Sequence, residues 1–168
     1  SRDRRIGARM INARCETLDE LQSFSPLLGT QRCLVLASGF FEWERVGKRK
    51  LPYFIKPGKS SIFAFAGLWD EWVADDGEVV TSCTIITTPA NTPVRRLHDR
   101  MPAILSPDLW HDWLDVDLPI SDVRAMLSTA EDDVVAMHRV SSVVNSIQND
   151  DPECVAELQL DLVEQMVE

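Results

Sequence analysis

Between residues 32 and 88 the chain consists of four strand-like segments separated by short turns, and no other feature constrains its fold as much. The segments are rich in β-branched, aromatic and other apolar residues and cover 32–46, 51–56, 61–73 and 78–88. Asp76-Gly77 is a strong β-hairpin signal, residues 47–50 mark another turn, and Gly39 predicts a bend within the first segment. This succession predicts antiparallel strands.

Short helices are predicted around these strands. Thr17-Leu18-Asp19-Glu20 matches a capping box, and Ser106-Pro107 matches an N-cap followed by proline at the first helical position. The predicted helices cover residues 17–23, 91–98, 106–115, 121–128 and 152–168, the last of them acidic and amphipathic, and a further strand covers 134–141. We therefore expect an α+β fold in a single domain over residues 1–168, with a curled antiparallel sheet or partial β-barrel core and short peripheral helices.

Charge is unevenly distributed along the sequence. The net charge of −10, taken alone, argues against a nucleic-acid partner. Residues 1–59, however, hold twelve Lys and Arg against six Asp and Glu, whereas residues 60–168 hold five against twenty-one. Either one basic face lies on an acidic body, which suits an anionic partner, or the two regions differ by chance.

The composition disfavours several classes of protein. No apolar run approaches the roughly 20 residues of a membrane-spanning helix, and residues 1–14 lack the apolar segment of a secretory signal. Four cysteines at wide spacings without a C-x-x-C pair, and three histidines, favour neither a disulfide framework nor a zinc site. We therefore expect no metal, no cofactor, no membrane association and a reducing, cytoplasmic location.

Three polar stretches, at residues 11–16, 39–43 and 97–102, interrupt the apolar pattern. In the second stretch, Glu42 lies among aromatic residues. Burial there would disfavour the charged carboxylate and raise its pKa, which suits general acid–base catalysis. The alternative is that strand alternation points Glu42 to solvent.

The other two stretches hold residue types that bind or move charge. His98 has an unperturbed pKa near neutrality and suits proton transfer, although a lone histidine is more often structural. Asn12 suits either the orientation of a reacting group or a turn before a helix. Arg14 and Arg100 suit either bidentate phosphate binding or ordinary surface salt bridges. None of these spacings is specific on its own.

Together the motifs resemble a known family. The strings MINARCETL, SGFFEWERV, FAFAGLWDEW, TIITTPAN, LHDRMPAIL and VNSIQND follow one another between Arg9 and Pro152. Their combination and order resemble the SOS response-associated peptidase (SRAP) domain over most of the chain. The resemblance implies the SRAP fold and a DNA-damage response protein that senses abasic sites in single-stranded DNA and becomes covalently attached to them.

The resemblance also implies a mechanism. A family member exposes a cysteine at its mature N-terminus, whose amine attacks the aldehyde of the opened sugar and whose thiol closes a thiazolidine ring. Three residues would be catalytic. Asn12 would position the cysteine or the sugar, Glu42 would transfer protons, and His98 would assist ring opening.

DNA contacts are implied for four further residues. Arg14 and Arg100 would hold the flanking phosphates, and Trp43 would pack near the adjoining base. Thr87 would add a weaker polar contact. The expected partner is single-stranded DNA containing abasic sites, which a narrow pocket would favour over duplex DNA. A monomer that is nucleoid-associated during DNA damage is expected.

The sequence departs from the family pattern at its start. The family begins Met-Cys-Gly-Arg several dozen residues before Asn-Ala-Arg, whereas here Asn12 is the twelfth residue. We therefore expect this chain to lack the N-terminal segment of its domain and the nucleophilic cysteine, which would leave this fragment alone inactive. Cys15 is expected to be a structural thiol. Two alternatives remain: a thiol autopeptidase or hydrolase that removes its own initiator Met, and a non-catalytic single-stranded DNA-binding module.

Overall fold

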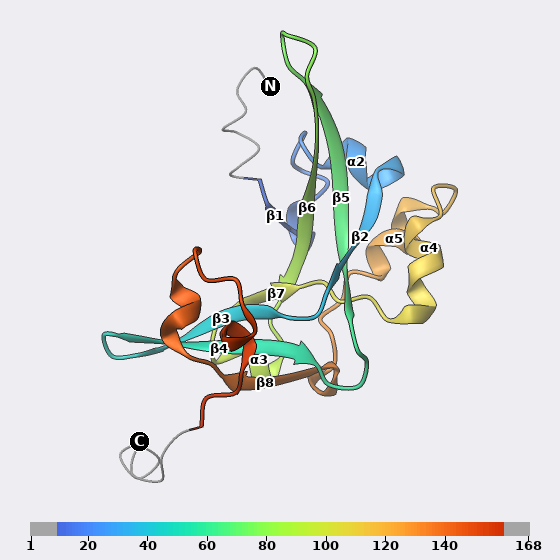
Figure 1. The fold of residues 1–168 in the computed structure, drawn as a ribbon. Coiled ribbons are helices and arrows are strands. Elements are labelled where there is room, and N and C mark those ends of the chain that lie inside the picture. The colour runs from blue at the N-terminus through green and yellow to red at the C-terminus, as the bar shows by residue number, and fades with distance from the viewer. Residues whose placement is uncertain (1–9, 160–168) are drawn as a thin grey trace.

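The computed structural model describes residues 10–159, which form two sheets whose strands run roughly across one another (Figure 1). The larger sheet has the strand order β1-β6-β5-β2, with β7 also paired to β6. Its strands are β1 (Asn12–Arg14), β2 (Arg32–Ala37), β5 (Phe63–Val73), β6 (Val79–Pro89) and β7 (Arg100–Pro102). All its pairs are antiparallel except β1–β6, which is parallel. The Asp76-Gly77 hairpin is confirmed, with Gly77 at a φ of 88° between β5 and β6.

The smaller sheet is antiparallel and has the strand order β3-β4-β8. Its strands are β3 (Phe40–Val46), β4 (Arg49–Pro57) and β8 (Val135–Arg139). The predicted bend at Gly39 is therefore a break at which the chain leaves one sheet for the other. A Cβ atom at Gly39 would lie 2.3 Å from the ring of Phe54 and 2.6 Å from the carbonyl oxygen of Ile55, so close passage over β4 requires glycine.

The helices among the described residues are short and peripheral. The α-helices are α2 (Ser25–Thr30), α3 (Thr92–Arg95), α4 (Trp110–Leu114) and α5 (Ile120–Ala125). The 3₁₀ turns are η1 (Cys15–Thr17), η2 (Pro107–Leu109), η3 (Asp132–Val134), η4 (Ser142–Asn145) and η5 (Pro152–Val155). The helices predicted over 91–98, 106–115 and 121–128 are thus present in shorter form. None of the helices in residues 10–159 is long and apolar enough to cross a membrane.

The helix predicted over 17–23 is wrong. A 3₁₀ turn ends at Thr17, non-helical turns follow, and the first α-helix is α2, with Pro26 in its first turn. Leu18 and Phe24 are both buried in one core. Leu18 lies inside the predicted range and Phe24 just after it, and an irregular turn that buries both takes the place of the predicted helix.

The helix predicted over 152–168 does not begin as predicted. Its first residues form the 3₁₀ turn η5, after which Ala156 is extended and Glu157 bridges Val140. Backbone pairing with the end of β8 therefore replaces helical hydrogen bonds in this segment. The rest of the predicted helix, residues 160–168, lies outside the described residues.

Two apolar cores lie on the two faces of the larger sheet. In β5, Ala66 and Leu68 pack into a core that includes Trp113 of α4, whereas Phe63 and Phe65 pack into a second core with residues of β4 and α3. This division follows from the two-residue period of a strand. The expected α+β class with short peripheral helices is confirmed, and the mainly antiparallel core consists of two sheets that do not close into a barrel.

Candidate active site

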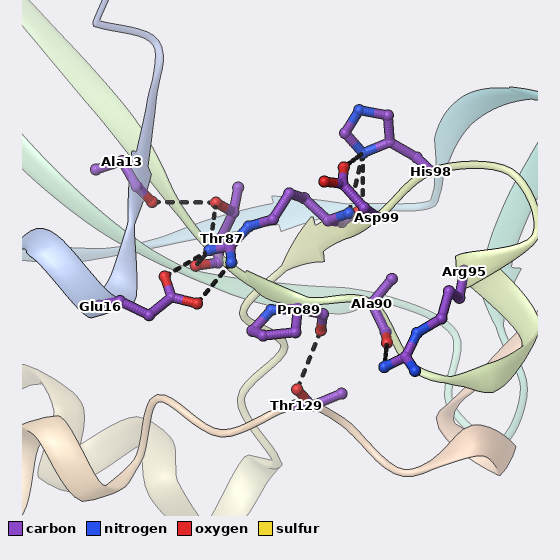
Figure 2. Close-up of polar contacts among 10 residues, drawn as sticks. Ala13, Glu16, Thr87, Pro89, Ala90, Arg95, His98, Asp99 and Thr129 are labelled. Atoms are coloured by element: carbon purple, nitrogen blue, oxygen red, sulfur yellow. Dashed lines mark hydrogen bonds and ion pairs between the residues drawn. The ribbon is translucent and has the colours of Figure 1, made fainter.

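The short segment between α3 and β7 joins the two parts of the candidate site. The ring of His98 is half-exposed, with its Nδ1 3.3 Å from the carboxylate of Asp99. The backbone N–H of Arg100 donates to this Nδ1 at 3.0 Å (Figure 2). In a neutral ring an accepting Nδ1 places the proton on Nε2, which has no hydrogen-bond partner within residues 10–159.

Arg100 forms the centre of the first part. Its Nη1 and Nη2 donate to the two carboxylate oxygens of Glu16 at 2.6 and 2.9 Å. Nη2 also donates to the carbonyl and the hydroxyl oxygen of Thr87 at 2.6 and 3.2 Å, and the Thr87 hydroxyl donates to the carbonyl of Ala13 at 3.2 Å (Figure 2). The guanidinium lowers the pKa of Glu16 to about 2 and has its own pKa raised in return. Most donors of Arg100 are therefore used within the protein.

Glu42 forms the second part, on β3. Its side chain is half-buried, and burial raises its pKa, while the nearby charge of His98 acts in the opposite direction. The carboxylate of Asp99 contributes a smaller rise. Glu42 and His98, which are 56 residues apart in the sequence, therefore lie within electrostatic range of each other. The alternative that Glu42 points freely into solvent is wrong.

Asn12 and Arg14 lie on β1, at the edge of the larger sheet. Both are exposed, and Ala13 between them is buried on the opposite face. Arg14 is in register with Thr87 of β6, so its backbone lies beside the Arg100 network. In residues 10–159 no hydrogen bond or ion pair engages the guanidinium of Arg14, and none joins Asn12 to Glu42 or His98.

Trp43 leaves β3 on the face opposite Glu42, because neighbouring strand residues alternate. Its indole Nε1 donates to the side-chain oxygen of Asn145 in η4 at 2.8 Å. The structure thus groups Glu42 with His98, and Thr87 with Arg100, but does not bring Trp43 to the Glu42–His98 pair.

Two residues of this site were missed by the sequence predictions. Glu16 holds Arg100, and Asp99 lies beside His98. Both belong to motifs that the sequence analysis used, Asn-Ala-Arg-x-Glu and His-Asp-Arg-Met-Pro, but no local pattern pairs Glu16 with a residue 84 positions away. Cys15 is half-buried, and burial raises the pKa of its thiol, which disfavours the reactive thiolate.

No cluster of three metal-ligating side chains occurs in the part of the chain that the structure describes. A cavity of about 520 Å³ lies elsewhere, between the start of β5 and the segments around Trp110 and Thr129. None of the predicted site residues lines it. The candidate chemistry is therefore at the surface near His98 rather than in this cavity.

Comparison with known proteins gives a consistent result. The family model described as SOS response associated peptidase (SRAP) matches residues 1–147. "Abasic site processing protein YoqW" of Bacillus subtilis is 41% identical over 157 residues, covering 92% of this chain and 70% of that protein. "Abasic site processing protein HMCES" of Gallus gallus is 36% identical, and the match covers 89% of this chain and half of that protein. A crystal structure of a protein from Bacteroides thetaiotaomicron superposes with a TM-score of 0.88 at 28% identity, covering 95% of this chain and 72% of the other.

Proposed function

Because the chain belongs to the SOS response-associated peptidase (SRAP) family, we propose that it acts in the DNA-damage response by recognising abasic sites in single-stranded DNA. The names of its relatives as abasic site processing proteins support this proposal. The observation that carries it is the pairing of Glu42, whose pKa burial raises, with His98, in the segment that continues into Arg100, while Arg14 lies in strand register with Thr87, a partner of the Arg100 guanidinium. An acid–base pair beside cations suits a phosphodiester with a reactive sugar.

The proposed reaction is covalent capture of the opened abasic sugar by an aminothiol. An N-terminal cysteine of the full-length protein would supply the amine and the thiol. The amine adds to the aldehyde carbon, water leaves to give an imine, and the thiol adds to the imine carbon to close a thiazolidine. Glu42 would give a proton to the departing hydroxyl and accept one from the attacking group.

His98 and Asn12 would act before and around this step. The Nε2 of His98 is free to exchange a proton with the sugar and would assist ring opening. Asn12, exposed on β1, would orient the cysteine or the opened sugar through its amide.

The phosphates would be held chiefly by Arg14, whose donors are free of protein partners within residues 10–159. Arg100, with most of its donors on Glu16 and Thr87, would supply charge and shape the wall of the site. Base stacking on Trp43 remains a prediction, as do the monomeric state, the preference for single strands and an association with the nucleoid during DNA damage.

The test uses full-length protein and an abasic single-stranded oligonucleotide. Glu42→Gln should slow the formation of a denaturation-resistant adduct by about 100-fold, because a positioned acid–base group contributes roughly 10²–10⁴ in rate. Non-covalent binding should change by less than about twofold. Glu44→Gln, two residues along the same strand face, is the matched control and should react as the wild type does. A wild-type rate in Glu42→Gln would remove Glu42 from the mechanism.

A second candidate function is peptide hydrolysis, which the description of the matching family favours. It would take the form of removal of the initiator Met by the protein itself. Incubation of the full-length protein with unrelated peptides separates the two functions, because turnover of peptides in trans would support a general hydrolase. DNA binding without any adduct would instead support a non-catalytic binding module.

A further inference from the structure

The hairpin that joins β3 to β4 carries a concentration of positive charge. It turns through Gly47-Lys48, with Gly47 at a φ of 60°, and pairs Val46 with Arg49. Positive φ at the first of the two loop residues is typical of a type II′ turn. The hairpin projects away from the body of the molecule (Figure 1). A projecting turn is well placed to contact an extended partner.

The cations of this turn are not explained by acidic partners among the described residues. Arg45, Lys48, Arg49 and Lys50, which we call the basic hairpin, are all exposed. Within residues 10–159 none of them forms a hydrogen bond or ion pair with an acidic side chain. Arg45 lies directly opposite Lys50 in the strand register, and like charges in that position destabilise a sheet. In a chain of net charge −10, this arrangement costs stability and so points to an anionic ligand.

The basic hairpin is continuous with the strand that carries Glu42. At about 3.3 Å per residue along β3, Arg45 lies about 10 Å from Glu42, and the turn lies about 16 Å from Glu42. At roughly 3.4 Å per stacked nucleotide, these distances correspond to about three to five nucleotides along one strand. Nucleic acid held at Glu42 would therefore bring its backbone within reach of the tip of the hairpin, at Lys48 and Arg49, whereas Arg45 and Lys50 lie on the opposite face of the two strands.

We infer that the basic hairpin is a second phosphate-binding element, which contacts the DNA backbone several nucleotides to one side of the lesion. The inference rests on the function proposed above and adds a footprint to it. An acidic protein surface fits less well, because Lys is depleted in protein–protein interfaces and Val46 is the hairpin's only apolar side chain between Arg45 and Lys50.

The experiment compares two double variants of the full-length protein. Lys48→Gln with Arg49→Gln removes two charges from the tip of the basic hairpin. Lys56→Gln with Lys59→Gln removes two exposed charges from the far end of β4 and just beyond it. Affinity is measured for single-stranded oligonucleotides with a chemically reduced abasic site, which has no aldehyde to capture, and either two or eight nucleotides on its 5′ or 3′ side; adduct formation is followed separately on the same oligonucleotides before reduction.

We expect wild type and control to gain affinity when the strand is extended on one side only, and the hairpin variant to lose this gain. Two lost phosphate contacts should lower the slope of log affinity against log salt concentration by about 1.4. Between 50 and 200 mM salt, the affinity of the hairpin variant should then fall about sevenfold less than that of the wild type. The melting temperature of the hairpin variant without DNA should not fall, because neither side chain has an acidic partner among the described residues.

The two proposals fail in different ways. The inference would be overturned if the hairpin and control variants gained equal affinity when the oligonucleotide is extended. It would also be overturned if the wild type gained affinity on extension at both sides of the lesion, or at neither side. If wild type forms no adduct with any oligonucleotide but still gains affinity on one-sided extension that the hairpin variant lacks, the proposed covalent function is overturned and the hairpin inference stands.

Discussion

The carboxylate of Glu16 determines how much of Arg100 is available to a ligand. It occupies both outer nitrogens of the guanidinium, and that contact lowers its pKa to about 2. A depressed pKa in the fold stabilises the protein above the unfolded pKa near 4.5 and loses that contribution as the pH falls toward 2. The Glu16–Arg100 ion pair therefore stabilises the fold at neutral pH and loses this contribution in acid.

Glu16→Gln should accordingly lower the free energy of unfolding by about 1 kcal/mol at pH 7, since nearly half of the Glu16 side chain is exposed and water screens the pair. At pH 2–3 the difference from wild type should shrink toward zero. Urea unfolding at the two pH values measures both quantities. A difference that is unchanged between them would show that the ion pair adds nothing to stability.

The contribution of Glu42 to stability should depend on pH in the opposite direction from that of Glu16. Burial raises its pKa, so the fold favours the neutral acid. That preference stabilises the protein below the unfolded pKa and is lost as the pH rises through the folded pKa. Glu42→Gln should therefore equal the wild type in stability at pH 3–4 and exceed it at pH 7, in the manner of a residue kept for function. Denaturant unfolding of both proteins across this range is the measurement, and a variant less stable than wild type at pH 7 would contradict it.

At the scale of elements, Arg32 ties the first core together. It is 6% exposed and donates to the carbonyls of Leu28, Gly29 and Trp113 at 2.6–2.7 Å, and also to that of Asp115. A β2 side chain thus satisfies carbonyls at the ends of α2 and α4, which short helices cannot satisfy internally.

Arg32→Met should destabilise the protein by about 2–4 kcal/mol, because it leaves several buried carbonyls without a donor. Arg124→Met is the control, because Arg124 is partly exposed and within residues 10–159 forms an ion pair with Asp19 alone, and it should cost less than about 1 kcal/mol. Thermal and denaturant unfolding give both values. Equal losses in the two variants would show that the carbonyls find other donors.

The elements that the sequence predicted well are those with a strong local signal. β5 and β6 follow from apolar strand segments on either side of Asp76-Gly77, and α3 is capped by Asn91, whose side chain accepts from the N–H of Val94. The helix over 17–23 is wrong despite its capping box, because an irregular turn that buries Leu18 and Phe24 takes its place. The parallel partner of β1 could not be predicted, since it depends on a contact more than 70 residues away.

Local sequence patterns predicted only part of the candidate site. Polar residues in apolar segments identified Glu42, which is half-buried, but its neighbours His98 and Asp99 come from the segment between α3 and β7, which is distant in the sequence. The resemblance to the family implied roles for Glu42 and His98 in one site, but not for Asp99. The resemblance did not reveal that the carboxylate of Glu16 binds both terminal nitrogens of the Arg100 guanidinium, because that contact exists only in the folded molecule.

For the whole molecule, the distribution of charge leads to a prediction about binding. The net charge of −10 repels DNA, so attraction must come from local cations such as Arg14. Arg14→Ala should weaken the binding of single strands irrespective of sequence and lower the salt slope by about 0.7, the value for one phosphate contact. Arg124→Ala is the control, and titrations at several salt concentrations measure both variants. An unaltered slope in Arg14→Ala would exclude this residue from phosphate binding.

The break at Gly39, where the chain passes from the larger sheet to the smaller one, affects how Glu42 and His98 are positioned. Glu42 belongs to the smaller sheet, whereas the segment with His98 leads into β7 of the larger one. The spacing between acid and imidazole is therefore set by the orientation of two separately hydrogen-bonded bodies, and the ring of Phe54 pressed against Gly39 helps to fix that orientation. Added bulk at this joint would leave each body intact yet alter their mutual alignment, so catalysis is expected to be more sensitive than folding to what occupies position 39.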